Sequence, residues 1–251
     1  MTLFDFHRQR RLGEEAPLPA RMRPRSFDEF VGQEHIVGEG RVLRRAIEQD
    51  RLPSMILWGP PGSGKTTLAH LIAGVTRSHF VMVSAVSAGV ADLRRVVEEA
   101  RERRGMYGQR TILFIDEIHR FNKAQQDAIL PYVEDGTITL IGATTENPSF
   151  EVISALLSRC RVFTLQPLTD EQVDTIVGRA LADPDRGLGR LNAELPEEAR
   201  RHLVSMSHGD ARVALSALEL AVAATPPDEE DRRRVDLAAV EDALQHPALL
   251  Y

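Results

Sequence analysis

A glycine-rich segment, set between a short apolar run and a helical pattern, constrains the fold of this 251-residue chain more than any other feature. The apolar run covers residues 55–58, and the helical pattern covers residues 66–75. The segment between them is Gly59-Pro60-Pro61-Gly62-Ser63-Gly64-Lys65-Thr66-Thr67. It fits the pattern G-x-x-x-x-G-K-[ST], whose glycines allow unusual dihedral angles and a close approach of ligand to backbone. A strand, a glycine loop and a helix in this order predict α/β architecture with a phosphate-binding loop.

Lys65 is one of only two lysines, with Lys123, among the 31 lysine and arginine residues. A slim, flexible lysine can curl into a glycine loop and reach β- and γ-phosphates, which the planar fork of arginine does less well. Backbone N–H groups of residues 61–66 and the positive end of the following helix would complete the phosphate site. We therefore expect a nucleoside triphosphate here, with the Thr66 hydroxyl on Mg²⁺.

Composition narrows the class of protein. A hydrophobic content of 43% supports a proper core, and a net charge of −6 argues against coating nucleic acid over the whole surface. Local basic runs exist at the start of the chain and at residues 232–234. The single cysteine, Cys160, excludes an internal disulfide and suits a reducing cytosol. No apolar stretch approaches the length that spans a membrane.

Short apolar runs alternate with helical segments from about residue 27 to residue 166, which predicts a parallel sheet with helices on both faces. The expected strands are residues 55–58, 80–83, 111–115, 139–142 and 162–165. The helices expected between them are residues 66–75, 92–104 and 123–134. After Pro167 we expect helices only, over residues 169–181, 196–207, 211–224 and 236–245. Three parts follow: a flexible basic arm (1–25), an α/β nucleotide-binding domain (26–166) and a small helical domain (167–251).

The third expected strand has an apolar run at residues 112–115 that ends in the carboxylates Asp116 and Glu117. Asp116 would bind Mg²⁺, directly or through water, and Glu117 would polarise the attacking water as a general base. Solvated acids at a strand end are common, but this pair follows a phosphate loop and so favours hydrolysis. A GTPase would need an Asn-Lys-x-Asp guanine clamp. The only Asn-Lys pair, Asn122-Lys123, is not followed by that aspartate, so ATP is expected.

Three weaker candidates complete the expected site. Thr145, or less convincingly Asn147, follows the next strand and could hold the γ-phosphate or the water. Arg159 lies too far along the chain for its own site, but would suit a neighbouring subunit's site as a finger on developing phosphate charge. Arg212, near a helix N-terminus, could also reach phosphate. The alternative for each arginine is an ordinary surface role, which for Arg212 means a salt bridge with Asp210 or Glu219.

These motifs in this order resemble those of the AAA+ ATPases, in particular the clamp-loader-like branch. Residues 59–67 resemble Walker A and residues 112–117 Walker B, while Thr145, Arg159 and Arg212 match the sensor 1, arginine-finger and sensor 2 positions. The helical domain resembles the lid of these proteins. The resemblance also implies an adenine pocket lined by Arg23, Pro24, Val31, Gly32 and Gln33.

Residues 20–24, 116–123 and 142–150 resemble a narrower family, the replication-associated recombination proteins RarA or MgsA, with the Werner-helicase-interacting protein as eukaryotic relative. This resemblance implies a cytoplasmic, nucleoid-associated bacterial ATPase. It would be stimulated by DNA at stalled forks, duplex ends or gaps, with strand separation as a further activity. Single-strand-binding protein is a further expected partner. Separately, Thr2-Leu3-Phe4-Asp5-Phe6 resembles the short Leu-Phe peptides that dock on the bacterial sliding clamp, and an unstructured start of the chain is the alternative. The family continues into a collar that forms tetramers, so we expect this chain to be truncated and to assemble weakly.

Other functions remain open at this point. A sliding-clamp-loader subunit shares the Ser-Arg-Cys motif and the lid, and would co-purify with other loader subunits. A Holliday-junction motor like RuvB would form a hexameric ring with DNA. A nucleotide-gated scaffold would bind ATP to arrange its partners and hydrolyse it slowly, with or without DNA.

Overall fold

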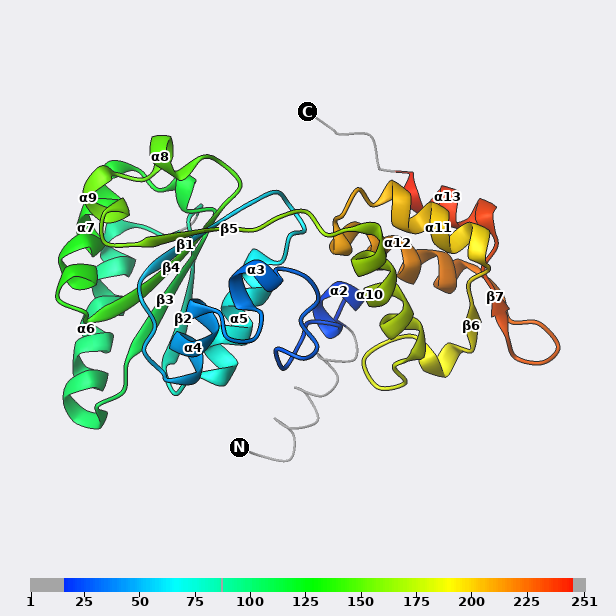
Figure 1. Ribbon diagram of the computed structural model, residues 1–251, viewed down its shortest axis with the longest axis horizontal. Helices are drawn as coiled ribbons and strands as arrows, with labels where there is room; N and C mark the ends of the chain where they lie inside the picture. The colour runs from blue at the N-terminus through cyan, green and yellow to red at the C-terminus, as the bar shows by residue number, and fades with distance from the viewer. Residues whose placement is uncertain (1–15, 87, 246–251) are drawn as a thin grey trace. The chain divides into compact units, whose positions relative to one another are not determined.

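The computed structural model describes residues 16–86 and 88–245, which form two compact units (Figure 1). The first, called the α/β unit here, comprises Pro24–Gln166. The second, called the helical unit, joins the described residues before Pro24 to those from Pro167 onward. Each unit has its own apolar core and is described by itself.

The α/β unit is built on a five-stranded, all-parallel sheet, which confirms the predicted fold class (Figure 1). Its strands are β1 (Met55–Trp58), β2 (His79–Ser84), β3 (Thr111–Asp116), β4 (Ile138–Thr144) and β5 (Arg161–Thr164). Their spatial order is β2-β3-β4-β1-β5. The carboxyl ends of parallel strands share one edge, so the segments that follow β1, β3 and β4 come together there.

Helices cover both faces of this sheet because its strands are apolar on both sides. Along β3, Ile112 and Phe114 join one core cluster, whereas Leu113 and Ile115 join the other. Buried residues of α3 (Glu34–Val37), α4 (Val42–Glu48) and α5 (Lys65–Val75) belong to the first cluster. The second cluster takes residues from α6 (Val90–Tyr107), α7 (Lys123–Glu134) and α9 (Ser154–Leu157). The short η1 (Ile118–Arg120) and α8 (Pro148–Glu151) complete this unit.

The helical unit contains four longer helices around one apolar core. They are α10 (Asp170–Ala182), α11 (Glu197–Met206), α12 (Ala211–Ala224) and α13 (Leu237–Leu244). The expectation of helices only is wrong in detail, because β6 (Ala193–Glu194) pairs with β7 (Arg233–Arg234) in parallel, next to η2 (Gly189–Leu191). Two-residue strands are too short to leave a periodic signal in the sequence.

The described residues before Pro24, residues 16–23, differ from the flexible arm expected over residues 1–25. The short helix α2 (Leu18–Arg21) places the fully buried Leu18 side chain in the core of the helical unit. The Leu18 N–H donates to Glu219 Oε2 at 2.8 Å, and Arg21 Nη2 donates to Glu219 Oε1 at 2.8 Å. Glu219 lies 201 positions after Leu18, so no local pattern could indicate the contact. Residues 1–15, with Leu3, Phe4 and Phe6, lie outside the described residues.

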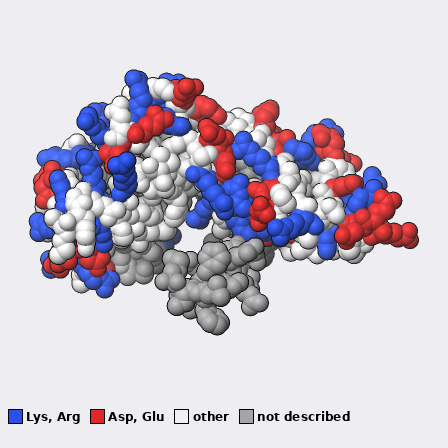
Figure 2. Space-filling model, turned by 90° about the horizontal axis from the view of Figure 1, so that it is seen from below, with Lys and Arg blue, Asp and Glu red and all other residues white. Residues whose placement is uncertain are grey.

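Acidic and basic side chains lie side by side on the face shown in Figure 2. This mixture agrees with a net charge of only −6. Within the described ranges, none of the helices is both long enough and apolar enough to cross a membrane.

Candidate functional site

The glycine loop leaves the carboxyl end of β1 and is anchored to both neighbouring strands. The Gly59 N–H donates to the Thr144 carbonyl at 3.2 Å, and the Leu165 N–H donates to the Trp58 carbonyl at 2.6 Å. A Cβ at Gly59 would lie 2.5 Å from the Leu165 carbonyl oxygen, so only glycine fits there. Gly64, with φ of 94°, turns the loop into α5 in the left-handed region that glycine tolerates best.

Lys65 is buried inside this loop, with only 7% of its surface exposed. Its Nζ donates to the carbonyls of Gly59 and Pro60, each at 2.8 Å, so the loop backbone already holds the ammonium group in place. Lys65 is also the first residue of α5, whose N-cap, Gly64, offers no side chain to the first-turn N–H groups. The positive end of this helix is therefore available to an anion.

Thr66 and Asp116 bring the loop and the end of β3 together. The Thr66 hydroxyl donates to Asp116 Oδ2 at 3.2 Å, although the two residues are 50 positions apart. A hydroxyl and a carboxylate are oxygen ligands of the kind that Mg²⁺ prefers. The donor set therefore fits the ion that the sequence predicts.

Glu117 follows directly and takes a left-handed backbone conformation, with φ of 56°. It opens the 3-10 turn η1, and its side chain is 40% exposed. Glu117 Oε2 lies 3.1 Å from His119 Nε2 in an ion-pair geometry. The expected general base is therefore in contact with an imidazole on the same turn.

The end of β4 separates the two candidates for the γ-phosphate sensor. The Asn147 side chain caps α8, because its Oδ1 accepts the Ser149 N–H at 3.0 Å. Thr144 is fully buried and lies 3.0 Å from His119 Nδ1 through its Oγ1. Thr145 is half-buried and comes next in the chain. The engaged side chain of Asn147 supports Thr145 as the sensor candidate.

The residues of the expected adenine box differ in their surroundings. Arg23 is exposed and belongs to the helical unit, whereas Pro24 and Val31 are half-buried in the α/β unit. Gly32 has φ of 81°, and Gln33 is 4% exposed. The Gln33 Nε2 donates to the carbonyls of Ser63 at 3.2 Å and Gln166 at 2.7 Å, and Oε1 accepts the Gln166 N–H at 3.0 Å. The Gln33 amide therefore holds the glycine loop at Ser63 and joins it to Gln166.

Arg159 lies at the opposite edge of the sheet from the glycine loop of its own chain. It comes just before β5, whose first residue Arg161 is in register with Met55 at the start of β1. Arg159 Nη2 forms an ion pair with Glu134 Oε1 at 3.0 Å, and Nη1 donates to Ser158 Oγ at 2.6 Å. Burial raises the pKa of the neighbouring Cys160 thiol to about 12, so this thiol stays protonated at neutral pH.

Arg212 lies in the first turn of α12 in the helical unit, and 68% of its side chain is exposed. Its Nε is 3.9 Å from Asp210 Oδ1, a long ion pair that permits other partners. The alternative pair with Glu219 is not formed, since Glu219 pairs with Arg21. The role of Arg212 at a nucleotide stays a prediction.

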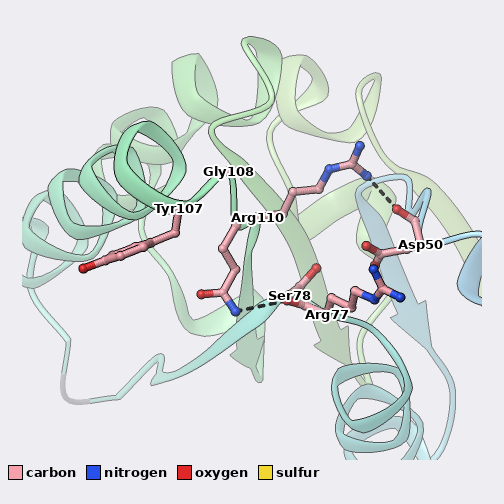
Figure 3. A pocket seen from close by; sticks show the side chains of 7 residues that line it. Asp50, Arg77, Ser78, Tyr107, Gly108 and Arg110 are labelled. Carbon is pink, nitrogen blue, oxygen red and sulfur yellow. Dashed lines mark hydrogen bonds between the residues drawn. The ribbon is translucent and has the colours of Figure 1, made fainter.

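A surface hollow of about 510 Å³ lies apart from these residues, at the amino ends of β2 and β3 (Figure 3). Its lining is Asp50, Arg77, Ser78, Tyr107, Gly108, Gln109 and Arg110. Arg110 Nη1 donates to the Asp50 carbonyl at 2.7 Å, and Gln109 Nε2 donates to the Arg77 carbonyl at 3.1 Å. These bonds tie loops together at the edge of the sheet that faces away from the glycine loop.

Two further residues escape the sequence analysis. His119 contacts Glu117 and Thr144, as described above. Gln126, 2% exposed, donates through Nε2 to the carbonyls of Phe121 at 3.0 Å and Glu151 at 2.9 Å, and its Oε1 accepts the Ile153 N–H at 2.8 Å. It thus ties the turn after the acid pair to the segment that leads to Arg159. The sequence signal that could have indicated Gln126 is the presence of a polar glutamine on the apolar face of α7.

Two protein-family models match the chain, one on each unit. "ATPase family associated with various cellular activities (AAA)" matches residues 55–168, and "AAA C-terminal domain" matches residues 189–251. Together with the parallel sheet and the site at its carboxyl edge, these matches make the chain an AAA+ ATPase in class.

Similar proteins define its place within this class. Replication-associated recombination protein A of Coxiella burnetii is 53% identical over 228 residues, covering 91% of this chain and 51% of the relative. The Escherichia coli K12 protein of the same name is 51% identical, covering 86% and 48%. ATPase WRNIP1 of Dictyostelium discoideum is 43% identical, covering 88% and 25%. The chain belongs to this family, and it spans about half the length of its bacterial relatives.

A solved structure shares the fold. The Holliday junction branch migration motor RuvB of Thermotoga maritima aligns with a TM-score of 0.68 and 28% identity, covering 90% of this chain and 72% of that one. The RuvB-like arrangement of a parallel sheet followed by a helical region is therefore common to both.

Proposed function

We propose that this chain binds ATP with Mg²⁺ and hydrolyses it to ADP and phosphate, in the service of DNA transactions at stalled replication forks. The observation that carries the proposal is the 3.2 Å contact between Thr66 Oγ1 and Asp116 Oδ2, with Glu117 as the next residue. This contact joins the phosphate loop to an acid pair at one edge of the sheet. A phosphate site, a metal site and a general base thus lie within one small region.

Each residue has a chemical role in this proposal. Lys65 and the first turn of α5 hold the β- and γ-phosphates. Glu117 accepts a proton from the attacking water, and Thr145 orients the γ-phosphate or that water. Thr66 and Asp116 would hold Mg²⁺, which when bound would neutralise charge on the phosphate oxygens.

Arg159 is proposed to act on the nucleotide of a neighbouring copy. Its location at the amino edge of the sheet, and its partner Glu134 there, support this role, because its own glycine loop is at the other edge. Arginine fingers supplied by a second subunit stabilise charge on the transferred phosphoryl group. The site is then complete only in a homo-oligomer, which we propose to be a tetramer as the family resemblance implies.

The link to DNA rests on the family. We propose that forked, gapped or duplex-end DNA stimulates turnover, that strand separation can follow, and that the protein works in the bacterial cytoplasm at the nucleoid. Single-strand-binding protein and the sliding clamp are the proposed partners. The names of the relatives, which refer to replication-associated recombination, support this assignment.

The substitution Glu117→Gln tests the central role. It keeps the size and polarity of the side chain but removes the base, so we expect kcat to fall by two or more orders of magnitude while ATP binding persists. Turnover is measured as phosphate release and binding by titration with a fluorescent ATP analogue. Turnover near the wild-type rate would show that Glu117 is not the base.

A panel of DNA structures tests the link to forks. We expect the ATPase rate to rise with forked or gapped DNA more than with intact blunt-ended duplex of the same length. An equal, slow rate in every condition would instead favour the nucleotide-gated scaffold. Co-purification with the other subunits of a clamp loader would favour the loader function.

A further inference from the structure

We infer that His119 is a positioning residue for Glu117, and that it couples the general base to the polar end of β4. The inference rests on the proposed hydrolytic function. It requires that the imidazole contact both Glu117 and Thr144 and that these contacts orient the Glu117 carboxylate for catalysis. The hydrogen-bonding chemistry of the three side chains supports this role.

The contact with Glu117 has a defined direction. A carboxylate can only accept, so the 3.1 Å contact between His119 Nε2 and Glu117 Oε2 places the hydrogen on Nε2. The bond occupies one carboxylate oxygen and leaves Oε1 for the attacking water. The Glu117 side chain is 40% exposed and would otherwise sample several rotamers, whereas His119 is 15% exposed. The less exposed His119 imidazole therefore restricts the rotamers of the more exposed Glu117 carboxylate.

The other ring nitrogen is also engaged. His119 Nδ1 lies 3.0 Å from Thr144 Oγ1, which also accepts the Glu146 N–H at 3.0 Å. In the neutral imidazole with hydrogen on Nε2, Nδ1 is an acceptor for the Thr144 hydroxyl hydrogen, and the Glu146 carbonyl at 3.3 Å is the other acceptor within reach of that hydroxyl. Thr144 is fully buried and directly precedes the proposed sensor Thr145. Both nitrogens are thus bonded, which fixes the orientation of the ring.

The backbone of η1 is shaped to bring His119 to this position. Glu117 adopts φ of 56°, a conformation that costs a residue with a Cβ free energy and is retained where neighbouring contacts enforce it. The Arg120 N–H donates to the Glu117 carbonyl at 2.9 Å. Ile118 is buried against Gly142 of β4, where a Cβ would lie 2.9 Å from Ile118 Cδ1. The turn is therefore seated on β4, and His119 reaches Thr144 as a result.

This arrangement has a consequence for the reaction. A base that is already oriented does not have to lose rotamer freedom when the water attacks, so the barrier is lower. The same imidazole contacts the strand whose end faces the γ-phosphate in the proposed site. A displacement of the end of β4 would therefore change the orientation of the Glu117 carboxylate, because His119 is bonded both to Thr144 and to Glu117.

Two nearly isosteric substitutions separate the contacts of His119. Glutamine places its amide nitrogen near the position of Nε2, so His119→Gln keeps a donor for Glu117. Asparagine places its amide near Nδ1, so His119→Asn keeps a partner for Thr144 and loses the donor. We expect kcat within about threefold of wild type for His119→Gln. For His119→Asn and His119→Ala we expect a loss of roughly 10- to 100-fold, the usual cost of losing a supporting partner. The KM for ATP should change little in all three variants.

A double-substitution cycle distinguishes positioning from simple structural support. If His119 acts through Glu117, His119→Ala lowers single-turnover hydrolysis in the wild type and leaves the residual rate of Glu117→Gln unchanged. A structural role would lower both rates. Thermal unfolding of each variant, with and without ATP, reports separately on folding and on binding.

The outcomes are distinct. A wild-type chain that hydrolyses ATP no faster than Glu117→Gln overturns the proposed function, and this inference with it. If the wild-type chain turns over normally and the three His119 variants, to Gln, Asn and Ala, have the same kcat as one another, the inference about His119 is overturned and the proposed function is not. A higher kcat in His119→Asn and His119→Ala also overturns it, because His119 would then restrain Glu117. Loss in Asn and Ala with retention in Gln supports it.

Discussion

The two edges of the central sheet carry different kinds of functional side chain. At the carboxyl edge the candidates contact one another or the loop: Lys65 holds loop carbonyls, Thr66 meets Asp116, and Glu117 meets His119. At the amino edge the candidate is Arg159, which pairs with Glu134 and donates to Ser158. One chain therefore gathers the residues proposed for phosphate, metal and water at one edge of the sheet and carries the proposed arginine finger at the other.

Strand direction explains this division. All five strands are parallel, so a residue before β5 and a loop after β1 cannot share an edge. The four residues of β1 alone span about 10 Å at roughly 3.3 Å per residue. Arg159 therefore has to serve another copy if it serves a nucleotide at all. Three substitutions test this contrast.

The largest effect is expected for Arg159→Ala. In assembled protein we expect kcat to fall by about 10³-fold, the lower end of the range for arginine fingers, while ATP affinity is kept. Phosphate release is measured at protein concentrations where sedimentation shows oligomers. Arg190→Ala is the matched control, because Arg190 is a 71% exposed arginine paired with Asp185 and is expected to be neutral.

Mixing the Arg159→Ala and Glu117→Gln variants tests directly whether Arg159 acts on a neighbouring copy. Arg159→Ala keeps an intact base and Glu117→Gln keeps an intact finger, so mixed oligomers contain some complete sites. We expect the mixture to hydrolyse ATP faster than either variant alone. No gain on mixing, with mixed oligomers shown by sedimentation, would contradict action in trans.

An intermediate effect is expected for Gly142→Ala at the carboxyl edge. The added Cβ would lie 2.8 Å from Ile56 Cδ1 and 2.9 Å from Ile118 Cδ1. Overpacking of this kind costs about 1–3 kcal/mol of unfolding free energy, measured by urea denaturation. Gly105→Ala in α6 is the control, because its Cβ meets no atom within 4 Å and should stabilise by about 0.5–1 kcal/mol. Equal stabilities for the two variants would show that Ile118 is not seated on β4 as described.

The smallest effect is expected for Glu134→Gln at the amino edge. It removes a half-exposed ion pair worth about 0.2–1 kcal/mol, so Arg159 becomes more available to a neighbour. We expect kcat to rise by no more than about fivefold, most visibly at low protein concentration. A fall in kcat instead would show that Glu134 aligns Arg159 for its task.

Local patterns predicted much of the fold because the elements concerned have local causes. The helices over residues 123–134 and 211–224 have the expected bounds, since each begins next to a capping residue, Asn122 or Asp210. The strand at residues 55–58 is a buried apolar run before glycine. The meeting of Thr66 and Asp116 at one edge followed from the parallel sheet.

Contacts made only by the folded chain could not be predicted in the same way. Leu18 is fully buried among helices far along the sequence, yet its neighbours are prolines and charges with no periodicity. His119 faces Glu117 because the residue before the turn adopts a positive φ, and composition does not reveal that conformation. The pairing of Arg159 with Glu134 likewise depends on where α7 ends relative to β5.

The amide of Gln33 has a mechanical consequence. It is bonded to Ser63 in the glycine loop and at two atoms to Gln166, the last residue of the α/β unit. The loop that receives phosphate and the root of the connection to the helical unit are therefore clamped together through one side chain. Any change in the position of the Ser63 carbonyl would reach Gln166 through the hydrogen bonds of this one amide.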